Sequence, residues 1–346
     1  MKARLLELLV CPYHGQALSL ETSLVNESAG GEIMEGQLSC SACQKSYPII
    51  AGIPRFTPVD HYSSSFGLQW NRYAKTQLDS HSGLPITQNR YAQVCRWQQK
   101  LGAGWGIEAG CGAGRFSEVL ANESLDWVCV DSSSAVNANY ANNGHRPNVH
   151  IVQADLRQPP FRKASFDRMI CLGVLQHTPD PRESFFSLLP LLKAKGEFAF
   201  DIYAKTTGTW LWSKYWLRPL SKRCPKAGLF KILSWTVPSL IFFHDVLRFI
   251  PYVGRYLAHR LVPVCNYKYS FPFSKKQNLE WALLDTFDML APEHDHPKSL
   301  AEIKNWVEQV PHSYQRVEFG PNGIIGQIVK GEVISSKCEI LARAKI

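Results

Sequence analysis

Three acidic residues follow three successive apolar runs of the chain, and a glycine-rich turn stands between the first two. Glu108 precedes this turn, Asp131 closes the next run about 20 residues later, and Asp155 closes the third. A carboxylate at the second position can accept hydrogen bonds from ribose hydroxyls, and one at the third can accept from an adenine amino group. Glu108 would repel a pyrophosphate but suits an ammonium and a sulfonium group. The pattern predicts a site for S-adenosylmethionine (SAM).

The turn reads Gly110-Cys111-Gly112-Ala113-Gly114. Glycines at a strand-to-helix junction let the backbone turn tightly and let a ligand lie against it without an intervening Cβ. Such a turn alone would equally suit a dinucleotide. Arg115 departs from the dinucleotide fingerprint, which argues against NAD.

Two ligand-x-x-ligand pairs stand near the N-terminus, Cys11 with His14 and Cys40 with Cys43. Thiolates and a neutral imidazole are the ligands that zinc takes in closed tetrahedral sites. A segment of this length buries little core, so a bound metal would supply its folding free energy. The alternative is that the cysteines are free thiols and His14 is an ordinary surface residue.

The pattern of elements predicts an α/β fold with a Rossmann-like sheet. Short β-rich runs alternate with helical stretches of about ten residues, as expected for parallel strands with crossover helices. These runs are residues 105–109, 127–131, 149–154, 166–173 and 196–203. A helical pattern over 300–309 precedes two further runs, 315–319 and 324–330, whose short turn predicts an antiparallel hairpin. Five parallel strands and a terminal hairpin distinguish this topology from the dinucleotide-binding one.

Over residues 101–203 the chain resembles class I SAM-dependent methyltransferases of the methyltransferase type 11-like group. The glycine turn and the three acids match that family's motifs, and residues 166–180 resemble its fourth-strand motif. The resemblance implies that residues 172–176 lie beside the methionine part of SAM. The predicted cofactor-binding residues are Glu108, Gly110, Cys111, Gly112, Gly114, Asp131, Ser132, Asp155, Leu156, Leu172, Gly173 and Gln176.

Residues 6–12 and 47–54 resemble the zinc-ribbon family that accompanies or activates many methyltransferases. His14 departs from that family, in which a cysteine is commoner at this position. The whole chain also resembles a bacterial group of ribbon-plus-methyltransferase proteins that are often linked to surface-glycan or lipid modification.

We expect five segments along the chain. They are a zinc ribbon (1–58), a linker with covering helices (59–104), a SAM-binding core (105–204), a basic, aromatic helical lid (205–276), and a last part (277–346) with a substrate-wall loop, a helix and the hairpin.

Candidate general bases stand after the fourth strand and in a late cluster of acids and histidines. A base assists an oxygen nucleophile, whereas methyl transfer itself depends largely on holding the two reactants in line. The candidates are His177, Asp285, Asp288 and His294. The alternative for His177 is that it caps its loop or packs near the cofactor. The alternative for the late cluster is that it forms a solvated loop.

The net charge of +9 comes from one segment, which carries +12 while the rest of the chain carries −3. Residues 205–276 hold 13 Lys and Arg against one acid, Asp245, together with 15 aromatic residues. Three interpretations fit such a segment. It can contact an anionic membrane surface, it can bind RNA, or it can form a lid whose apolar side belongs to the hydrophobic core. Its long aliphatic runs argue against RNA.

The sequence therefore predicts a SAM-dependent methyltransferase that acts on oxygen of a small or amphiphilic acceptor, such as a glycan or lipid precursor. The alternatives are an RNA base methyltransferase and a non-enzymatic SAM-binding regulator or partner subunit. Ten cysteines, mostly scattered singly, fit a reducing compartment. We expect a cytoplasmic protein. Peripheral contact with the cytoplasmic face of the membrane is compatible with this expectation.

Overall fold

The computed structural model describes residues 1–26, 31–57 and 64–331. The predicted boundary at residue 58, the first part of the predicted linker and the end of the chain from residue 332 lie outside the described residues.

A seven-stranded sheet forms the centre of the molecule, in the order β10-β11-β9-β8-β5-β6-β7. Its strands are β5 (Trp105–Ala109), β6 (Asp126–Asp131), β7 (Val149–Gln153), β8 (Phe166–Cys171), β9 (Leu192–Ile202), β10 (His312–Gly320) and β11 (Gly323–Lys330). Strands β5 to β9 pair in parallel, and β11 is antiparallel to both β9 and β10. The predicted fold class, five parallel strands with a terminal antiparallel hairpin, is confirmed.

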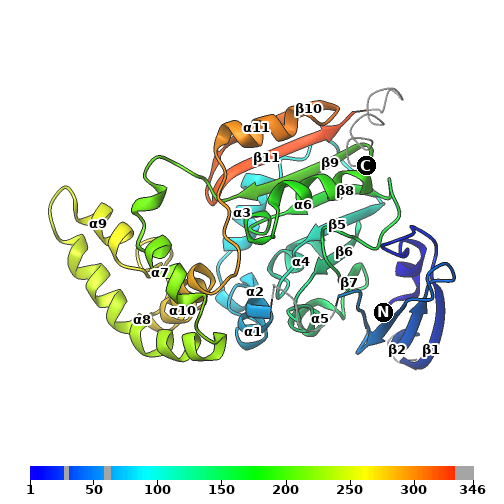
Figure 1. Ribbon diagram of the computed structural model, residues 1–346, viewed down its shortest axis with the longest axis horizontal. Helices are drawn as coiled ribbons and strands as arrows, with labels where there is room; N and C mark the ends of the chain where they lie inside the picture. Colours follow the sequence, from blue (N-terminus) through cyan, green and yellow to red (C-terminus); the bar gives the residue numbers. More distant parts are fainter. Residues whose placement is uncertain (27–30, 58–63, 332–346) are drawn as a thin grey trace.

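Helices cover both faces of this sheet, as Figure 1 shows. Helices α3 (Ile86–Val94), α4 (Arg115–Leu120) and α5 (Val136–Asn143) pack on one face, and α6 (Pro181–Leu188) and α11 (Leu300–Glu308) on the other. Helix α6 begins where the sequence favours it, because Pro181 occupies its first turn and the Asp180 carboxylate accepts from two backbone N–H groups. Strands β5 and β7 are buried along their whole length, as expected of strands covered on both faces.

The N-terminal segment is a four-stranded antiparallel sheet preceded by a short 3₁₀ helix, η1 (Ala3–Glu7). Its strands are β1 (Ser19–Asn26), β2 (Glu32–Ser39), β3 (Ser46–Ile50) and β4 (Ile53–Pro54). Lys2 Nζ donates to the carbonyls of Gly144 and Val149, at 2.9 and 2.7 Å. Leu5, Leu9 and Leu38 join the same hydrophobic cluster as the central sheet, so this small sheet packs directly on the larger one.

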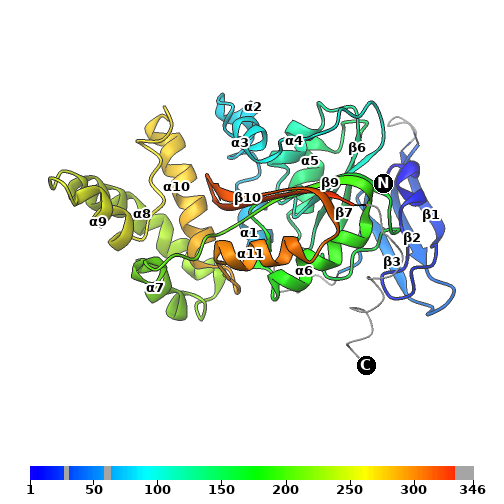
Figure 2. The same cartoon turned by 90° about the horizontal axis from the view of Figure 1, so that it is seen from above.

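Of the remaining helices, α7 to α10 gather at the end of the molecule farthest from the N-terminal sheet, whereas α1 and α2 lie nearer the central sheet (Figures 1 and 2). Their bounds are α1 (Ser64–Arg72), α2 (Asp79–Ser82), α7 (Ser213–Ser221), α8 (Lys226–Arg248), α9 (Gly254–Leu261) and α10 (Lys275–Leu290). Three further 3₁₀ turns are η3 (Leu175–His177), η4 (Leu189–Leu191) and η5 (Thr209–Leu211). Helices α8 and α10 share a third hydrophobic cluster. Segment 205–276 is thus largely helical, as predicted, while the predicted segment boundaries stay predictions.

Helix α10 differs from the predicted substrate-wall loop, because Asp285 and Asp288 lie on the helix itself. A capping box formed by Ser274 and Gln277 starts α10. The helix continues to Leu290 because its apolar residues, Phe287 among them, are buried against α8.

Candidate functional site

A cavity of about 1120 Å³ lies at the carboxyl ends of β5, β6 and β8. Its floor is the glycine turn after β5, and its opposite wall comes from α10 and from the segment around α7 and α9. Ligand pockets commonly measure ~300–1,000 Å³, so this one has room for a cofactor and an acceptor together.

The glycine turn holds the conformation that its sequence predicts. Gly110, Gly112 and Gly114 all have positive φ, between 51° and 90°. A Cβ on Gly110 would come within 2.3 Å of the Val174 side chain, so alanine does not fit there. Asp131 Oδ2 accepts from the backbone N–H of Gly112 at 2.9 Å, which ties the end of β6 to the turn.

Eight of the twelve predicted cofactor residues line the cavity. They are Gly110, Cys111, Gly112, Asp131, Ser132, Leu156, Leu172 and Gly173. Their types suit SAM, because Asp131 stands beside bare glycine backbone and leaves room for a ribose.

The other four lie outside the cavity lining, and their cofactor role stays a prediction. Glu108 is buried beneath the turn, where Ser117 Oγ donates to it at 2.5 Å; burial raises its pKa to about 8. Gly114 begins α4, and a Cβ there would lie 2.1 Å from Asn139 Oδ1. Asp155 accepts from the Arg157 side chain at 2.7 Å. Gln176 is fully buried.

Two half-buried cations that the sequence left unassigned as site residues also line the cavity, Arg90 on α3 and Arg115 at the start of α4. Arg90 Nη2 donates to Asp201 Oδ2 at 2.6 Å and would lie 3.3 Å from a Cβ on Gly173. Arg115 Nη1 donates to Gln77 Oε1 at 2.7 Å. Burial, then the charge of Arg90, lowers the pKa of Arg115 to about 10, so it stays protonated at neutral pH.

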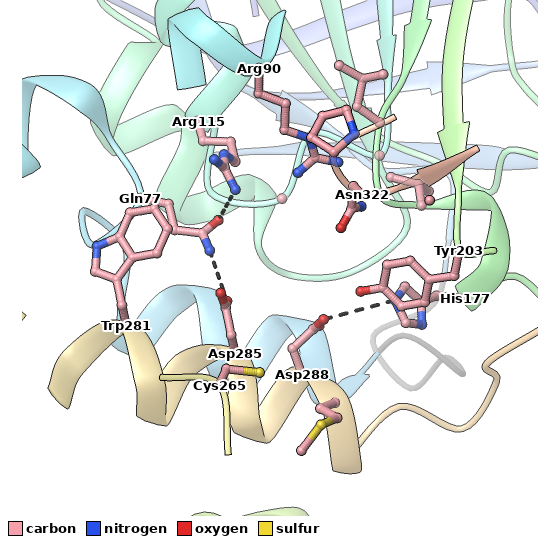
Figure 3. Close-up of a pocket in the computed structure, with 18 of the residues that line it drawn as sticks. Gln77, Arg90, Arg115, His177, Tyr203, Cys265, Trp281, Asp285, Asp288 and Asn322 are labelled. Carbon is pink, nitrogen blue, oxygen red and sulfur yellow. Dashed lines mark hydrogen bonds and ion pairs between the residues drawn. The ribbon is translucent and has the colours of Figure 1, made fainter. Parts of the chain in front are cut away.

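Asp285 and Asp288 project from α10 into the cavity, with Gln77 on one side and His177 on the other (Figure 3). Gln77 Nε2 donates to Asp285 Oδ1 at 2.9 Å, and the Tyr267 hydroxyl donates to Oδ2. Burial raises the pKa of Asp285 to about 6 and that of Asp288 to about 7; the charge of Asp295 contributes to the second shift. Both carboxyls thus titrate near the pH range in which a cell works.

His177 lines the cavity on the loop after β8, between the rings of Phe66 and Tyr203. Its Nδ1 lies 3.1 Å from the backbone carbonyl of His294, and its Nε2 lies 4.0 Å from Asp288 Oδ2. Burial lowers the pKa of His177 to about 4. The side chain of His294 stacks on His296, and His294 does not line the cavity.

The four predicted metal ligands come together in the N-terminal sheet. One ligand atom from each of Cys11, His14, Cys40 and Cys43 lies within 4.8 Å of the others. The Tyr47 hydroxyl lies 3.6 Å from Cys11 Sγ, where it can orient that sulfur. Three thiols and one imidazole at this spacing fit a closed tetrahedral zinc site.

Known protein families match two parts of the chain. Residues 107–200 match the methyltransferase domain family, and residues 2–52 match the Trm112p-like protein family. These ranges cover the glycine turn, the strands around it and all four metal ligands. The chain therefore contains a class I SAM-dependent methyltransferase domain, preceded by a Trm112-type zinc ribbon. SAM is its cofactor, and zinc is the metal that the ribbon fits.

Curated relatives of the methyltransferase include two enzymes named ubiquinone biosynthesis O-methyltransferase. That of Erwinia tasmaniensis is 27% identical over 110 residues, or 30% of this chain and 44% of the relative. That of Pasteurella multocida is 24% identical over 48% of this chain and 77% of the relative. The chain thus spans less than half the length of the first. Phosphoethanolamine N-methyltransferase 2 of Haemonchus contortus, a solved structure, is 15% identical with a TM-score of 0.44, over 81% and 62% of the two chains.

Asp131→Ala should raise the Kd for SAM at least about 100-fold, because hydrogen bonds to a charged group contribute about 1.5–3 kcal/mol each and two ribose hydroxyls would lose them. Calorimetric titration with SAM measures this. Asp126→Ala is the matched control, since Asp126 opens the same strand away from the cavity and pairs with Arg4. A Kd for Asp131→Ala equal to that of Asp126→Ala would contradict the assignment.

Proposed function

We propose that this methyltransferase transfers the methyl group of SAM to an oxygen atom of a small or amphiphilic acceptor, such as a glycan or lipid precursor. One observation carries the proposal: a buried histidine in the cavity wall has one ring nitrogen held by a backbone carbonyl and the other without a hydrogen-bond partner among the described residues. An alcohol or phenol oxygen needs such a base, because its proton must leave as the new bond forms.

His177 meets the requirements of that base. The carbonyl of His294 can only accept, so Nδ1 of His177 carries the ring proton and Nε2 keeps its lone pair. Its lowered pKa leaves the ring neutral at pH 7. Nε2 is buried without a hydrogen-bond partner in the described part of the chain and lies 4.0 Å from Asp288 Oδ2, so an acceptor hydroxyl would reach it once the side chains around it shift.

The proton balance follows from this geometry. SAM, held by Asp131, Arg90 and Arg115, would supply an electrophilic methyl group and a neutral thioether as the leaving group. The acceptor oxygen forms the new bond to carbon, and its proton moves to His177 Nε2. Ionised Asp288 then stabilises the imidazolium across 4.0 Å.

Arg90, Arg115 and Asp131 account for the cofactor's orientation. Arg90 lies over Gly173 on the side that the family resemblance assigns to the methionine part, so its guanidinium, with that of Arg115, is placed for a carboxylate. Asp131 is placed for the ribose. Holding the methyl group in line with the acceptor supplies much of the acceleration in such a transfer.

The lining of the acceptor end supports a partly apolar substrate. Trp212, Tyr215, Phe271 and Trp281 all line the cavity. The names of the curated relatives, O-methyltransferases, agree with an oxygen acceptor.

The test is transfer of radiolabelled methyl from SAM into a cell extract that is then separated into lipid, glycan, RNA, protein and small-molecule pools. Label in the lipid, glycan or small-molecule pool supports the proposal. Label in RNA would overturn the acceptor class. No label in any pool, from protein shown by calorimetry to bind SAM, would favour a non-enzymatic SAM-binding subunit.

The pH dependence of kcat/KM should reveal Asp288. Its carboxyl is neutral below about pH 7 and ionised above, so kcat/KM should rise several-fold as pH passes through about 7. Asp288→Asn should keep the low-pH rate and lose this rise. Rates of both proteins from about pH 5 to about pH 9 test this; an unchanged step in the variant would assign it to another group.

A further inference from the structure

Helix α8 carries two apolar stripes on opposite sides. Its inner side includes Phe230, Leu233 and Val237, which are buried in the cluster shared with α10. The other stripe, here called the outer stripe, repeats at spacings of three, four and seven residues, which places its members on one face of a helix. It consists of Ile232, Trp235, Phe242, Val246 and Phe249, whose exposed fractions lie between 48% and 83%.

The outer stripe continues beyond the helix. Ile250, Tyr252, Val253 and Tyr256, in the α8–α9 turn and the start of α9, are exposed as well. A helix on the surface of a globular protein normally turns a polar face outward. A contiguous exposed apolar surface of this kind marks a binding site, and no described part of the chain covers it.

The charge around the outer stripe indicates which kind of partner binds it. Segment 205–276 carries 13 Lys and Arg against one acid, and Lys222, Arg223, Lys231 and Arg255 are exposed on or beside α8 and α9. Two copies of the chain would bring like charges together, which opposes self-association through this surface. An anionic partner is favoured. Trp and Phe on one side of a helix with Lys and Arg around them are typical of helices at a lipid interface.

RNA fits the outer stripe less well, because bases stack on aromatic rings and gain little from Ile and Val side chains. Within the described residues, α8 is also the one helix long and apolar enough to cross a membrane. Its inner side, however, belongs to the hydrophobic cluster with α10, and buried His244 lies 3.1 Å from Asn266 Nδ2. Crossing a bilayer would separate α8 from α10 and place His244 in hydrocarbon, so α8 is suited to lie on the surface.

We propose that the outer stripe and the α8–α9 turn form a docking surface for an anionic lipid bilayer. The same helical segment walls the cavity through Trp212, Tyr215 and Arg260. The surface goes beyond the proposed function, because docking needs no methyl transfer.

Vesicle sedimentation of the full chain tests this proposal. The probes are vesicles of phosphatidylcholine alone and of phosphatidylcholine mixed with phosphatidylglycerol. The chain should sediment with the anionic vesicles and much less with the neutral ones. The triple variant Trp235→Ser, Phe242→Ser, Phe249→Ser should bind anionic vesicles at least about tenfold more weakly. The three side chains are exposed, so the fold should persist, and thermal unfolding confirms it.

The matched control is Leu24→Ser with Phe319→Ser, two exposed apolar side chains on the ribbon and the hairpin. This variant should sediment like the unmodified chain. Absence of binding to anionic vesicles, or equal binding by the triple variant, would overturn the proposal. A dimer in light scattering that the triple variant converts to a monomer would assign the surface to self-association, and RNA binding lost in that variant without vesicle binding would assign it to RNA; either result also overturns it.

Discussion

Replacing His177 with Asn should lower kcat for methyl transfer by about 10²- to 10⁴-fold, the range that general base catalysis contributes. Asparagine can still donate to the His294 carbonyl, but its amide cannot take a proton from the acceptor at neutral pH. The affinity for SAM should stay unchanged, because the predicted contacts of the cofactor come from Asp131, Arg90 and the glycine turn. Steady-state rates and calorimetric titration with SAM, on the same preparation, separate the two effects.

His150 provides a matched control. It is a second buried histidine whose pKa burial lowers to about 4, and its Nε2 lies 3.2 Å from Asp126 Oδ1, away from the cavity. His150→Asn should cost stability without lowering kcat of the folded protein. If both variants lost the same fraction of activity, His177 would have a structural role; if His177→Asn instead weakened SAM binding, it would be a cofactor contact.

The central sheet was predictable because each strand leaves a local signal. Strands β5 to β8 are short apolar runs that end in a polar or small residue, and buried parallel strands need that composition. Asp131 was predictable for the same reason, since a strand end fixes its place at the sheet edge. The other predicted cofactor residues that line the cavity, all in segment 105–204, were predictable in the same way, because they too follow the ends of strands.

Residues whose place depends on tertiary packing gave no such signal. Arg90 lies in a helix of low amphipathicity, within a segment predicted as linker and covering helices, and it reaches the cavity because α3 packs against α4 and the sheet. Gln77 lies just before α2, and Arg115 looked only like a departure from a glycine motif. The density of acids predicts Asp285 and Asp288 as site residues, and the capping box of Ser274 and Gln277 is the local signal that makes their segment a helix.

For Glu108 the sequence predicts the position at the end of a strand but not the direction of the side chain. Its position at the end of β5 matches the family motif, yet its side chain is buried under the turn and accepts a hydrogen bond from Ser117. Side chains alternate along a strand, and the sequence alone does not say which face of the sheet carries the ligand.

Removing zinc should unfold the N-terminal sheet. Structural zinc contributes an apparent ~10–16 kcal/mol to small zinc domains at neutral pH, far more than a sheet of this size can obtain from its own core. Cys40→Ser, which removes one ligand of four, should therefore lose the metal and the protection of residues 1–26 and 31–57 from hydrogen exchange. Metal content and exchange rates, before and after a chelator, measure both.

Loss of the ribbon should also weaken SAM binding, although none of its described residues lines the cavity. Thr57 Oγ1 donates to the carbonyl of Ser132 at 3.2 Å, and Arg55 donates to Asn137 Oδ1 at 2.7 Å, so the ribbon's last residues brace the loop after β6. Cys95→Ser, at a buried thiol outside the cluster, should cost stability but keep zinc and SAM affinity. Both predicted losses require the ribbon to depend on zinc. If a chelator changed neither the exchange protection nor the SAM affinity, the four ligands would lie together without a structural metal.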